Sequence, residues 1–139
     1  MSAFPDPAAL LPHGPPMRWL DAILASEGDH TRARAEVRAS WPLARDGRVP
    51  TVAALELLAQ VAAAHAALRR GEAEGRGFVV GCPELVMDRP WLAVGEVLEV
   101  ALQVEGDGRI VRVAGEVRAG HERVAHGTLL VVREGGGHG

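Results

Sequence analysis

Glu56 and Gln60 are polar residues within an apolar stretch of the chain, and their spacing allows them to act together. Residues 49–68 are almost wholly apolar, yet the segment ALELLAQ within them carries Glu56 and Gln60. Residues four apart on a helix lie one above the other on the same face. Burying an ionised carboxylate without a partner is costly. We therefore expect Glu56 to be hydrogen-bonded, to be uncharged, or to open onto a cavity.

The role of Glu56 can be catalytic or structural. An uncharged carboxyl group near neutral pH suits a general acid. In the structural alternative, Glu56 pairs with an arginine or a backbone N–H and only organises an interface. The residues alone leave both alternatives open.

Six histidines are the other candidates for proton transfer. His13 lies in the rigid, proline-rich segment LLPHGPPM, which could hold an imidazole against the domain. His65 is nine residues from Glu56, which rotates it by about 180° around a helix and assigns it to a different site. Core or interface roles are predicted for His65 and His126, and solvated positions for His30, His121 and His138. Because no carboxylate stands at ligand spacing from these histidines and Cys82 is the only cysteine, we expect neither a metal nor a disulfide.

The composition favours a small-molecule or protein partner in a reducing cytoplasm. A chain of 139 residues is the size of one domain, and its net charge of −3 gives no basic field for nucleic acid. The N-terminus lacks the basic and apolar regions of a signal peptide, and the apolar stretch is too interrupted to cross a membrane. Neither a nucleotide-binding glycine motif nor a G-x-S-x-G elbow is present, and no cofactor is predicted.

The elements that must position Glu56 follow from the hydrophobic pattern. Thr31–Arg38 alternates apolar and polar residues, which predicts a strand, and RWLDAIL before it begins another. A loop over residues 39–50 leads into a helix of about eighteen residues, roughly 27 Å long. Pro50 is expected in the first helical turn, with Thr51 as an alternative N-cap. Gly71 is expected to cap the other end.

The remainder of the chain reads as long antiparallel strands joined by tight turns such as EGDGR and AGHER. A long helix that is apolar all round must be covered on most sides, so the sheet has to curl around it. We therefore predict an α+β hotdog fold in one domain over residues 1–133, followed by a disordered tail at 134–139. The open edge of such a sheet favours dimerisation.

Three segments in order resemble the hotdog 3-hydroxyacyl-ACP dehydratases of the FabA/FabZ group. They are LLPHGPPMRWLD, GRVPTVAALELLAQ and ELVMDRPWLAVGEVLEV. The chain is most similar to the ApeP-like predicted dehydratases of aryl polyene clusters, from about Ala9 to Val132.

The resemblance implies a function in fatty acid or polyene-type biosynthesis, on an acyl thioester carried by ACP or CoA. The substrate would enter a tunnel at the interface of a homodimer or of a heterodimer with another hotdog protein. Glu56 matches the catalytic carboxylate of the family, and Gln60 matches a glutamine that contacts substrate. The backbone N–H groups of Val52 and Ala53 are the candidates to hold the thioester carbonyl oxygen.

The chain departs from the family where a catalytic histidine is expected before the helix. The corresponding stretch is SWPLARDGRVP, which contains Trp41 and Arg48 but no histidine. Three alternatives follow: His13 replaces the missing base, Glu56 works with a water molecule, or the chain is a weakly active or inactive subunit of a catalytic partner. A hotdog thioesterase, in which the helix carboxylate activates water, is a further alternative.

Overall fold

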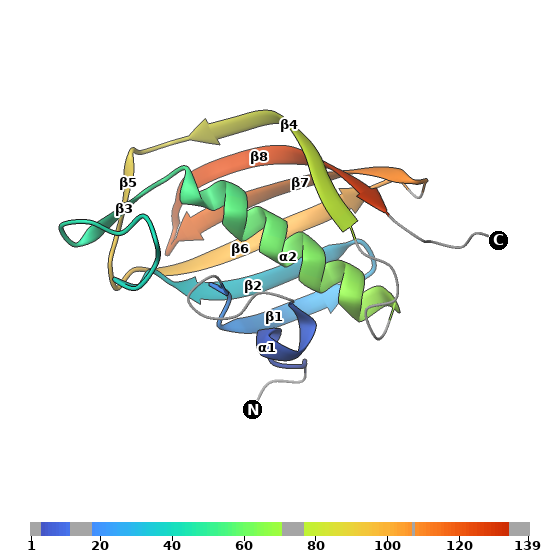
Figure 1. Ribbon diagram of the computed structural model, residues 1–139, viewed down its shortest axis with the longest axis horizontal. Helices are drawn as coiled ribbons and strands as arrows, with labels where there is room; N and C mark the ends of the chain where they lie inside the picture. The colour runs from blue at the N-terminus through green and yellow to red at the C-terminus, as the bar shows by residue number, and fades with distance from the viewer. Residues whose placement is uncertain (1–3, 12–17, 71–76, 107, 134–139) are drawn as a thin grey trace.

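A long helix lies in the curve of an antiparallel sheet (Figure 1). The computed structural model describes residues 4–11, 18–70, 77–106 and 108–133. The helices are α1 (Pro7–Leu10) and α2 (Ala53–Arg70). The strands are β1 (Ala22–Glu27), β2 (His30–Glu36), β3 (Arg48–Pro50), β4 (Gly77–Met87), β5 (Trp91–Ala93), β6 (Val97–Glu105), β7 (Ile110–Ala119) and β8 (Glu122–Arg133). This arrangement is the α+β hotdog fold that the sequence predicted.

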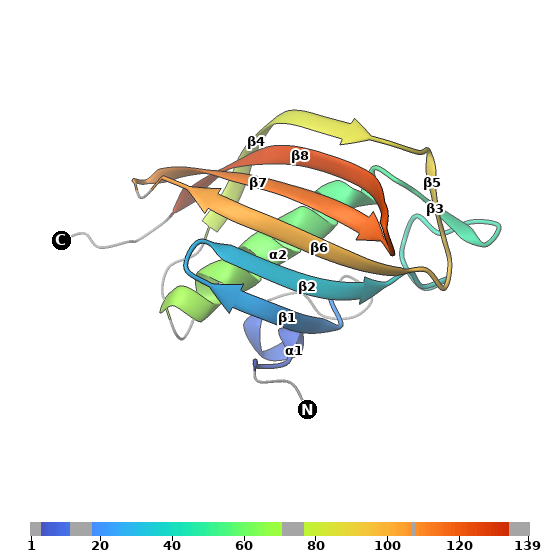
Figure 2. The same cartoon turned by 180° about the vertical axis from the view of Figure 1, so that it is seen from behind.

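Six of the strands form one sheet in the order β1-β2-β6-β7-β8-β4. Every neighbouring pair is antiparallel, and β6, β7 and β8 pair in succession, which confirms the predicted hairpins. The view from behind shows β1 at one edge of the sheet and β4 at the other (Figure 2). β3 and β5 form a separate two-stranded ribbon at one end. The six-stranded sheet therefore has two open edges, β1 and β4.

The core lies between the concave face of the sheet and α2. In β2, Thr31, Ala33 and Ala35 are buried while Arg32 between them is exposed, which confirms the predicted alternation. The largest apolar side chains of the core are fully buried on both layers, among them Leu57, Leu58 and Val61 on the helix and Leu98, Val100, Val117 and Leu129 on the sheet. Each contributes about 1.5–3 kcal/mol by leaving water. This packing fixes one face of α2 against the sheet.

Gly115 in β7 allows the helix to approach the sheet closely. A Cβ atom at this position would lie 2.5 Å from Leu58 Cδ2 and 2.9 Å from the backbone oxygen of Ala101. Both distances are shorter than van der Waals contact, and Leu58 is itself fully buried. Residue 115 therefore has to be a glycine for α2 to sit at its observed depth.

The start of α2 differs from the prediction. Pro50 lies in β3, which pairs with β5, so it is not in the first helical turn. Thr51 donates its N–H to the oxygen of Pro90, but its buried Oγ1 has no hydrogen-bond partner among the described residues, so this side chain does not cap the helix. Pairing of β3 with β5 overrides the local preference of proline for a helix start. The first strand also begins later than expected, at Ala22.

Several predictions fall on residues that the structure does not describe. They are the helix cap at Gly71, the site residue His13, His138 and the disordered tail at 134–139. One domain over residues 1–133 stays a prediction. Neither of the described helices has the length and hydropathy needed to span a membrane.

Candidate functional site

Glu56 lies in the first turn of α2 and is half-buried. The unpaired N–H groups at a helix start carry partial positive charge, which favours a carboxylate within the first turn. This placement supplies a physical reason for an acidic residue in an otherwise apolar helix.

Gln60, one turn further along α2, connects Glu56 to the N-terminal segment. Its Nε2 donates a hydrogen bond to Glu56 Oε2 at 2.9 Å. Its Oε1 accepts a hydrogen bond of 2.9 Å from the backbone N–H of Trp19. Gln60 is fully buried, whereas Glu56 is not. Of the three states expected for Glu56, the structure thus shows the hydrogen-bonded one.

The N–H groups predicted to hold a carbonyl oxygen lie just before and at the start of α2. Ala54 and Leu55 donate their N–H groups to the oxygens of Thr51 and Val52. Within the described part of the chain, no backbone oxygen accepts a hydrogen bond from the N–H of Val52 or Ala53. Both donors are at the positive end of the helix, where an anionic oxygen is stabilised. Their role in substrate binding stays a prediction.

Trp41 lies in the stretch that, by the resemblance, corresponds to the one in which the family carries its catalytic histidine. Its ring stacks on that of Trp19 with 4.4 Å between the ring centroids and 12° between the planes. Both side chains are buried, with only 3% and 4% of their surface exposed. Arg48, in the same stretch, lies over the ring of Trp91 at 4.0 Å. Neither aromatic contact supplies a group that could take up a proton.

The described histidines lie in other surroundings. His65 is buried, and its Nδ1 forms a 2.7 Å hydrogen bond with Thr31 Oγ1, which in turn bonds Ser26 at 2.8 Å. The predicted core role of His65 agrees with this chain of bonds. His30 and His121 are exposed, as expected.

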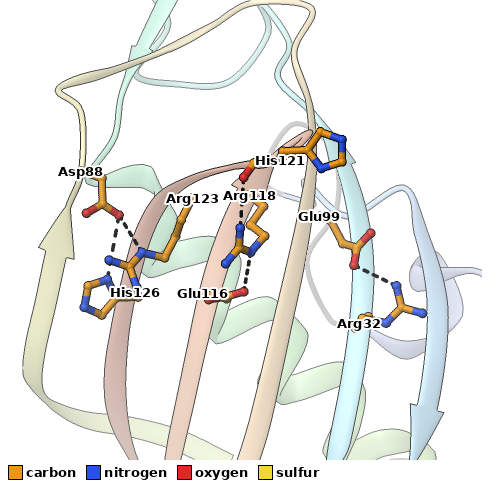
Figure 3. A network of polar contacts seen from close by, with 8 residues as sticks. All are labelled: Arg32, Asp88, Glu99, Glu116, Arg118, His121, Arg123 and His126. Atoms are coloured by element: carbon orange, nitrogen blue, oxygen red, sulfur yellow. Dashed lines mark hydrogen bonds and ion pairs between the residues drawn. The ribbon is translucent and has the colours of Figure 1, made fainter.

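His126 belongs to a network on the face of the sheet turned away from α2 (Figure 3). Its Nδ1 lies 3.9 Å from Asp88 Oδ2, and Arg123 donates to the same oxygen at 3.1 Å. Beside it, Arg118 donates to Glu116, and this hydrogen bond raises the pKa of Arg118 above its ordinary value. The network is separated from Glu56 by the sheet.

Arg89 and Glu96 brace the segment that holds the start of α2. Arg89 donates to Glu96 Oε2 at 2.7 Å, and the N–H of Ala93 donates to Glu96 Oε1 at 2.8 Å. Burial raises the pKa of Glu96, but these two hydrogen bonds outweigh it and hold the pKa below its ordinary value. Pro90, next to Arg89, accepts the N–H of Thr51. The ion pair between Arg89 and Glu96 therefore stabilises the segment whose Pro90 binds Thr51, just before α2.

A polar cleft of about 330 Å³ lies beside Trp41 but does not include Glu56 or Gln60. Asp21 in its wall is already paired with Arg38 at 2.9 Å and accepts the N–H of Glu36. The hydrogen bond from Arg38 to Asp21 raises the pKa of Arg38. Asp21 and Arg38, two of the charged residues that line this cleft, are thus paired with each other.

Among the described residues, no cluster of three or more histidine, cysteine or acidic side chains could hold a metal ion.

The structure adds Trp19 and Trp41 to the surroundings of Glu56, which the sequence did not associate with this site. Trp19 precedes β1 and acts through its backbone N–H, a group that every residue except proline carries. Residue type therefore gave no signal for its contact with Gln60.

Comparison with known proteins places the chain in a sequence family. The model of the ApeP-like family, described as ApeP dehydratase, matches residues 5–135. No curated protein matches the sequence.

Solved structures share the fold at low sequence identity. The dehydratase heterocomplex ApeI:P from Xenorhabdus doucetiae contains a chain with 21% identity and a TM-score of 0.84, over 96% of this chain and 93% of that chain. A mutant of the thioesterase PA1618 from Pseudomonas aeruginosa has 12% identity and a TM-score of 0.66, over 83% and 81%. The PaaI protein of the Escherichia coli phenylacetic acid degradation operon has 17% identity and a TM-score of 0.64, over 81% and 82%. At these identities the likeness shows the hotdog fold.

Proposed function

The chain belongs to the ApeP-like dehydratase family, and from this premise we propose that it is a 3-hydroxyacyl-thioester dehydratase subunit that uses Glu56 for proton transfer. The reaction removes a proton from the carbon next to the thioester carbonyl and a hydroxyl group from the following carbon. A double bond forms between these carbons, and the hydroxyl group leaves as water after it receives a proton. Two positioned groups are needed, one for each proton.

The observation that carries this proposal is the placement of Glu56 beside the N–H donors that begin α2. A thioester whose carbonyl oxygen contacts the N–H groups of Val52 and Ala53 would bring its reacting carbons toward the first helical turn. Developing negative charge on that oxygen would be stabilised by the helix start. Glu56, held by Gln60 from one turn further along α2, is then within the region where the protons move.

The second proton-transfer group is proposed to come from a partner hotdog chain. The stretch that corresponds to the one with the family histidine contains no histidine, and its Trp41 is packed against Trp19. A chain of similar fold belongs to the dehydratase heterocomplex ApeI:P, which supports assembly with an unlike chain. His13 and a water molecule activated by Glu56 are the alternatives within the chain.

The edge strand β4 is the proposed contact with that partner. Four of its large apolar side chains are exposed on this edge: Val79, Val80, Val86 and Met87, at 44%, 59%, 37% and 48%. On the opposite edge strand, β1, Leu24 is the large apolar side chain that is exposed. An open apolar edge strand is a template for antiparallel pairing with another chain. Pairing at β4 would cover these side chains and join the two sheets.

Assays on three classes of acyl thioester test the proposal. The chain alone, and mixed with hotdog chains that carry the family histidine, is offered 3-hydroxyacyl, enoyl and saturated acyl thioesters on ACP and on CoA. Dehydration of the 3-hydroxyacyl thioester by the mixture, with a large loss in Glu56→Gln, supports a dehydratase in fatty acid or aryl polyene biosynthesis. Wild-type rates in Glu56→Gln on every thioester would exclude it.

A hotdog thioesterase is the second candidate, because the thioesterase PA1618 shares the fold. In that chemistry the helix carboxylate would activate water against the thioester carbonyl. Release of free thiol from the saturated thioester, with no change in the 3-hydroxyacyl chain, identifies this activity. Equal behaviour of wild type and Glu56→Gln in all mixtures would instead indicate a non-catalytic subunit.

A further inference from the structure

Four residues form a continuous series of contacts that ends at the candidate catalytic carboxylate. Trp41 stacks on Trp19, the backbone of Trp19 bonds Gln60, and Gln60 bonds Glu56. The resemblance assigned Gln60 to substrate binding, but the residue is fully buried and both ends of its amide are engaged within the chain. Gln60 is thus placed to act on Glu56.

The chemistry of the donors fixes the orientation of the Gln60 amide. A backbone N–H can only donate, so the atom of Gln60 that faces Trp19 has to be the oxygen Oε1. The nitrogen Nε2 must then face Glu56, and Glu56 Oε2 must accept. Turning the amide over would set two donors against each other at Trp19 and two acceptors against each other at Glu56.

The aromatic stack anchors the backbone group that imposes this orientation. Trp19 and Trp41 are both buried, and their rings lie 4.4 Å apart and nearly parallel. An aromatic side chain of this size buries about 150–250 Å², so moving Trp19 away from Trp41 would expose a large apolar surface. The N–H of Trp19 is therefore a fixed donor. Gln60, on α2, accepts from this donor and in turn donates to Glu56.

We propose that Gln60 is a positioning residue that holds the Glu56 carboxylate in its reactive orientation, with the Trp19–Trp41 stack as its anchor. The inference rests on the proposed catalytic role of Glu56. It also gives Trp41, in the stretch that lacks the family histidine, a role in supporting the carboxylate. A misplaced reacting group can cost about 10²-fold in rate.

Nuclear magnetic resonance tests the contact without any substrate. The sequence contains two glutamines, Gln60 and Gln103, and no asparagine, so two side-chain amide pairs are expected in a ¹⁵N spectrum. Gln103 is exposed and provides an internal reference. We expect the Gln60 pair to exchange slowly with solvent and to shift in Glu56→Ala, while the Gln103 pair stays in place. A Gln60 pair that exchanges as fast as that of Gln103, or that does not respond to Glu56→Ala, would overturn the proposal.

Kinetics of paired variants test whether Gln60 acts through Glu56. Gln60→Met removes the hydrogen bonds to Trp19 and Glu56, whereas Gln60→Glu keeps the acceptor for Trp19 and replaces the amide donor to Glu56 with a second carboxyl group. Both are expected to lower kcat by about 10–100-fold with KM changed by less than about twofold. Gln103→Met is the matched control on the surface and should leave kcat unchanged.

A double-mutant cycle separates positioning from a merely structural role. In the Glu56→Gln background, Gln60→Met should lower kcat by less than about twofold, because no carboxylate is left to position. The same loss in both backgrounds would overturn the positioning role while leaving the catalytic role of Glu56 intact. A wild-type rate for Glu56→Gln would instead overturn the proposed function, and the spectroscopic result would stand independently.

Discussion

Replacement of Gly115 by alanine should destabilise the fold by forcing α2 away from the sheet. The new Cβ atom would lie 2.5 Å from Leu58 Cδ2 and 2.9 Å from the oxygen of Ala101. Leu58 is fully buried, and the oxygen of Ala101 belongs to the backbone of β6, so neither can easily yield. Overpacking of this kind costs about 1–3 kcal/mol, and a clash with backbone places the cost near 3 kcal/mol. The displaced segment of α2 also carries Glu56, so activity should fall as well.

Thermal and urea unfolding followed by circular dichroism measure this effect. For a chain of this size, a loss of about 3 kcal/mol lowers Tm by roughly 10 °C. The urea midpoint should fall with an unchanged slope. Gly108→Ala is the control, because a Cβ atom there meets no atom within 4 Å. A Gly115→Ala protein that unfolds within about 0.5 kcal/mol of wild type would refute the close approach of helix and sheet.

Three further predictions concern the supports and the edge of the site. The lowered pKa of Glu96 stabilises the fold above the unfolded-state pKa, and this stability is lost as pH falls through the folded-state pKa. Glu96→Gln removes the negative charge opposite Arg89 and keeps only one of the two acceptor oxygens, so it should cost about 1–2 kcal/mol at neutral pH in urea unfolding, with the difference shrinking in acid. A difference independent of pH would contradict this. The stacked rings of Trp19 and Trp41 should give an exciton couplet in far-ultraviolet circular dichroism that Trp41→Phe abolishes, and an unchanged couplet would argue against the stack. Cys82 is exposed at the midpoint of β4. If two copies of this chain pair along β4, a bismaleimide should crosslink their Cys82 thiols, whereas a pair with an unlike chain should give no crosslink between copies. Crosslinked copies in the active assembly would contradict the unlike pair.

Long, periodic elements could be predicted from the sequence because their pattern reflects burial directly. The alternation over Thr31–Arg38 identified β2, and the apolar run identified α2 and the shared face of Glu56 and Gln60. A four-residue spacing on a helix fixes neighbours without knowledge of the rest of the chain.

Features that depend on tertiary contact could not be predicted in this way. The ribbon of β3 and β5 consists of three-residue strands, too short to show a period, and it removes Pro50 from the helix. Trp19 and Trp41 are 22 positions apart and neither belongs to a helix or strand. Their stack, and the backbone bond to Gln60 that it supports, arises only when the N-terminal segment packs against α2.

The most direct test of the proposed function is the dehydration rate of a 3-hydroxyacyl thioester by the chain assembled with a histidine-bearing hotdog partner. Wild type and Glu56→Gln are compared in the same assembly, with folding of the variant confirmed by its unfolding midpoint. Loss of one of two proton-transfer groups should lower kcat by about 10²–10⁴-fold. An unchanged kcat in the Glu56→Gln assembly would show that this carboxylate does not take part in the reaction.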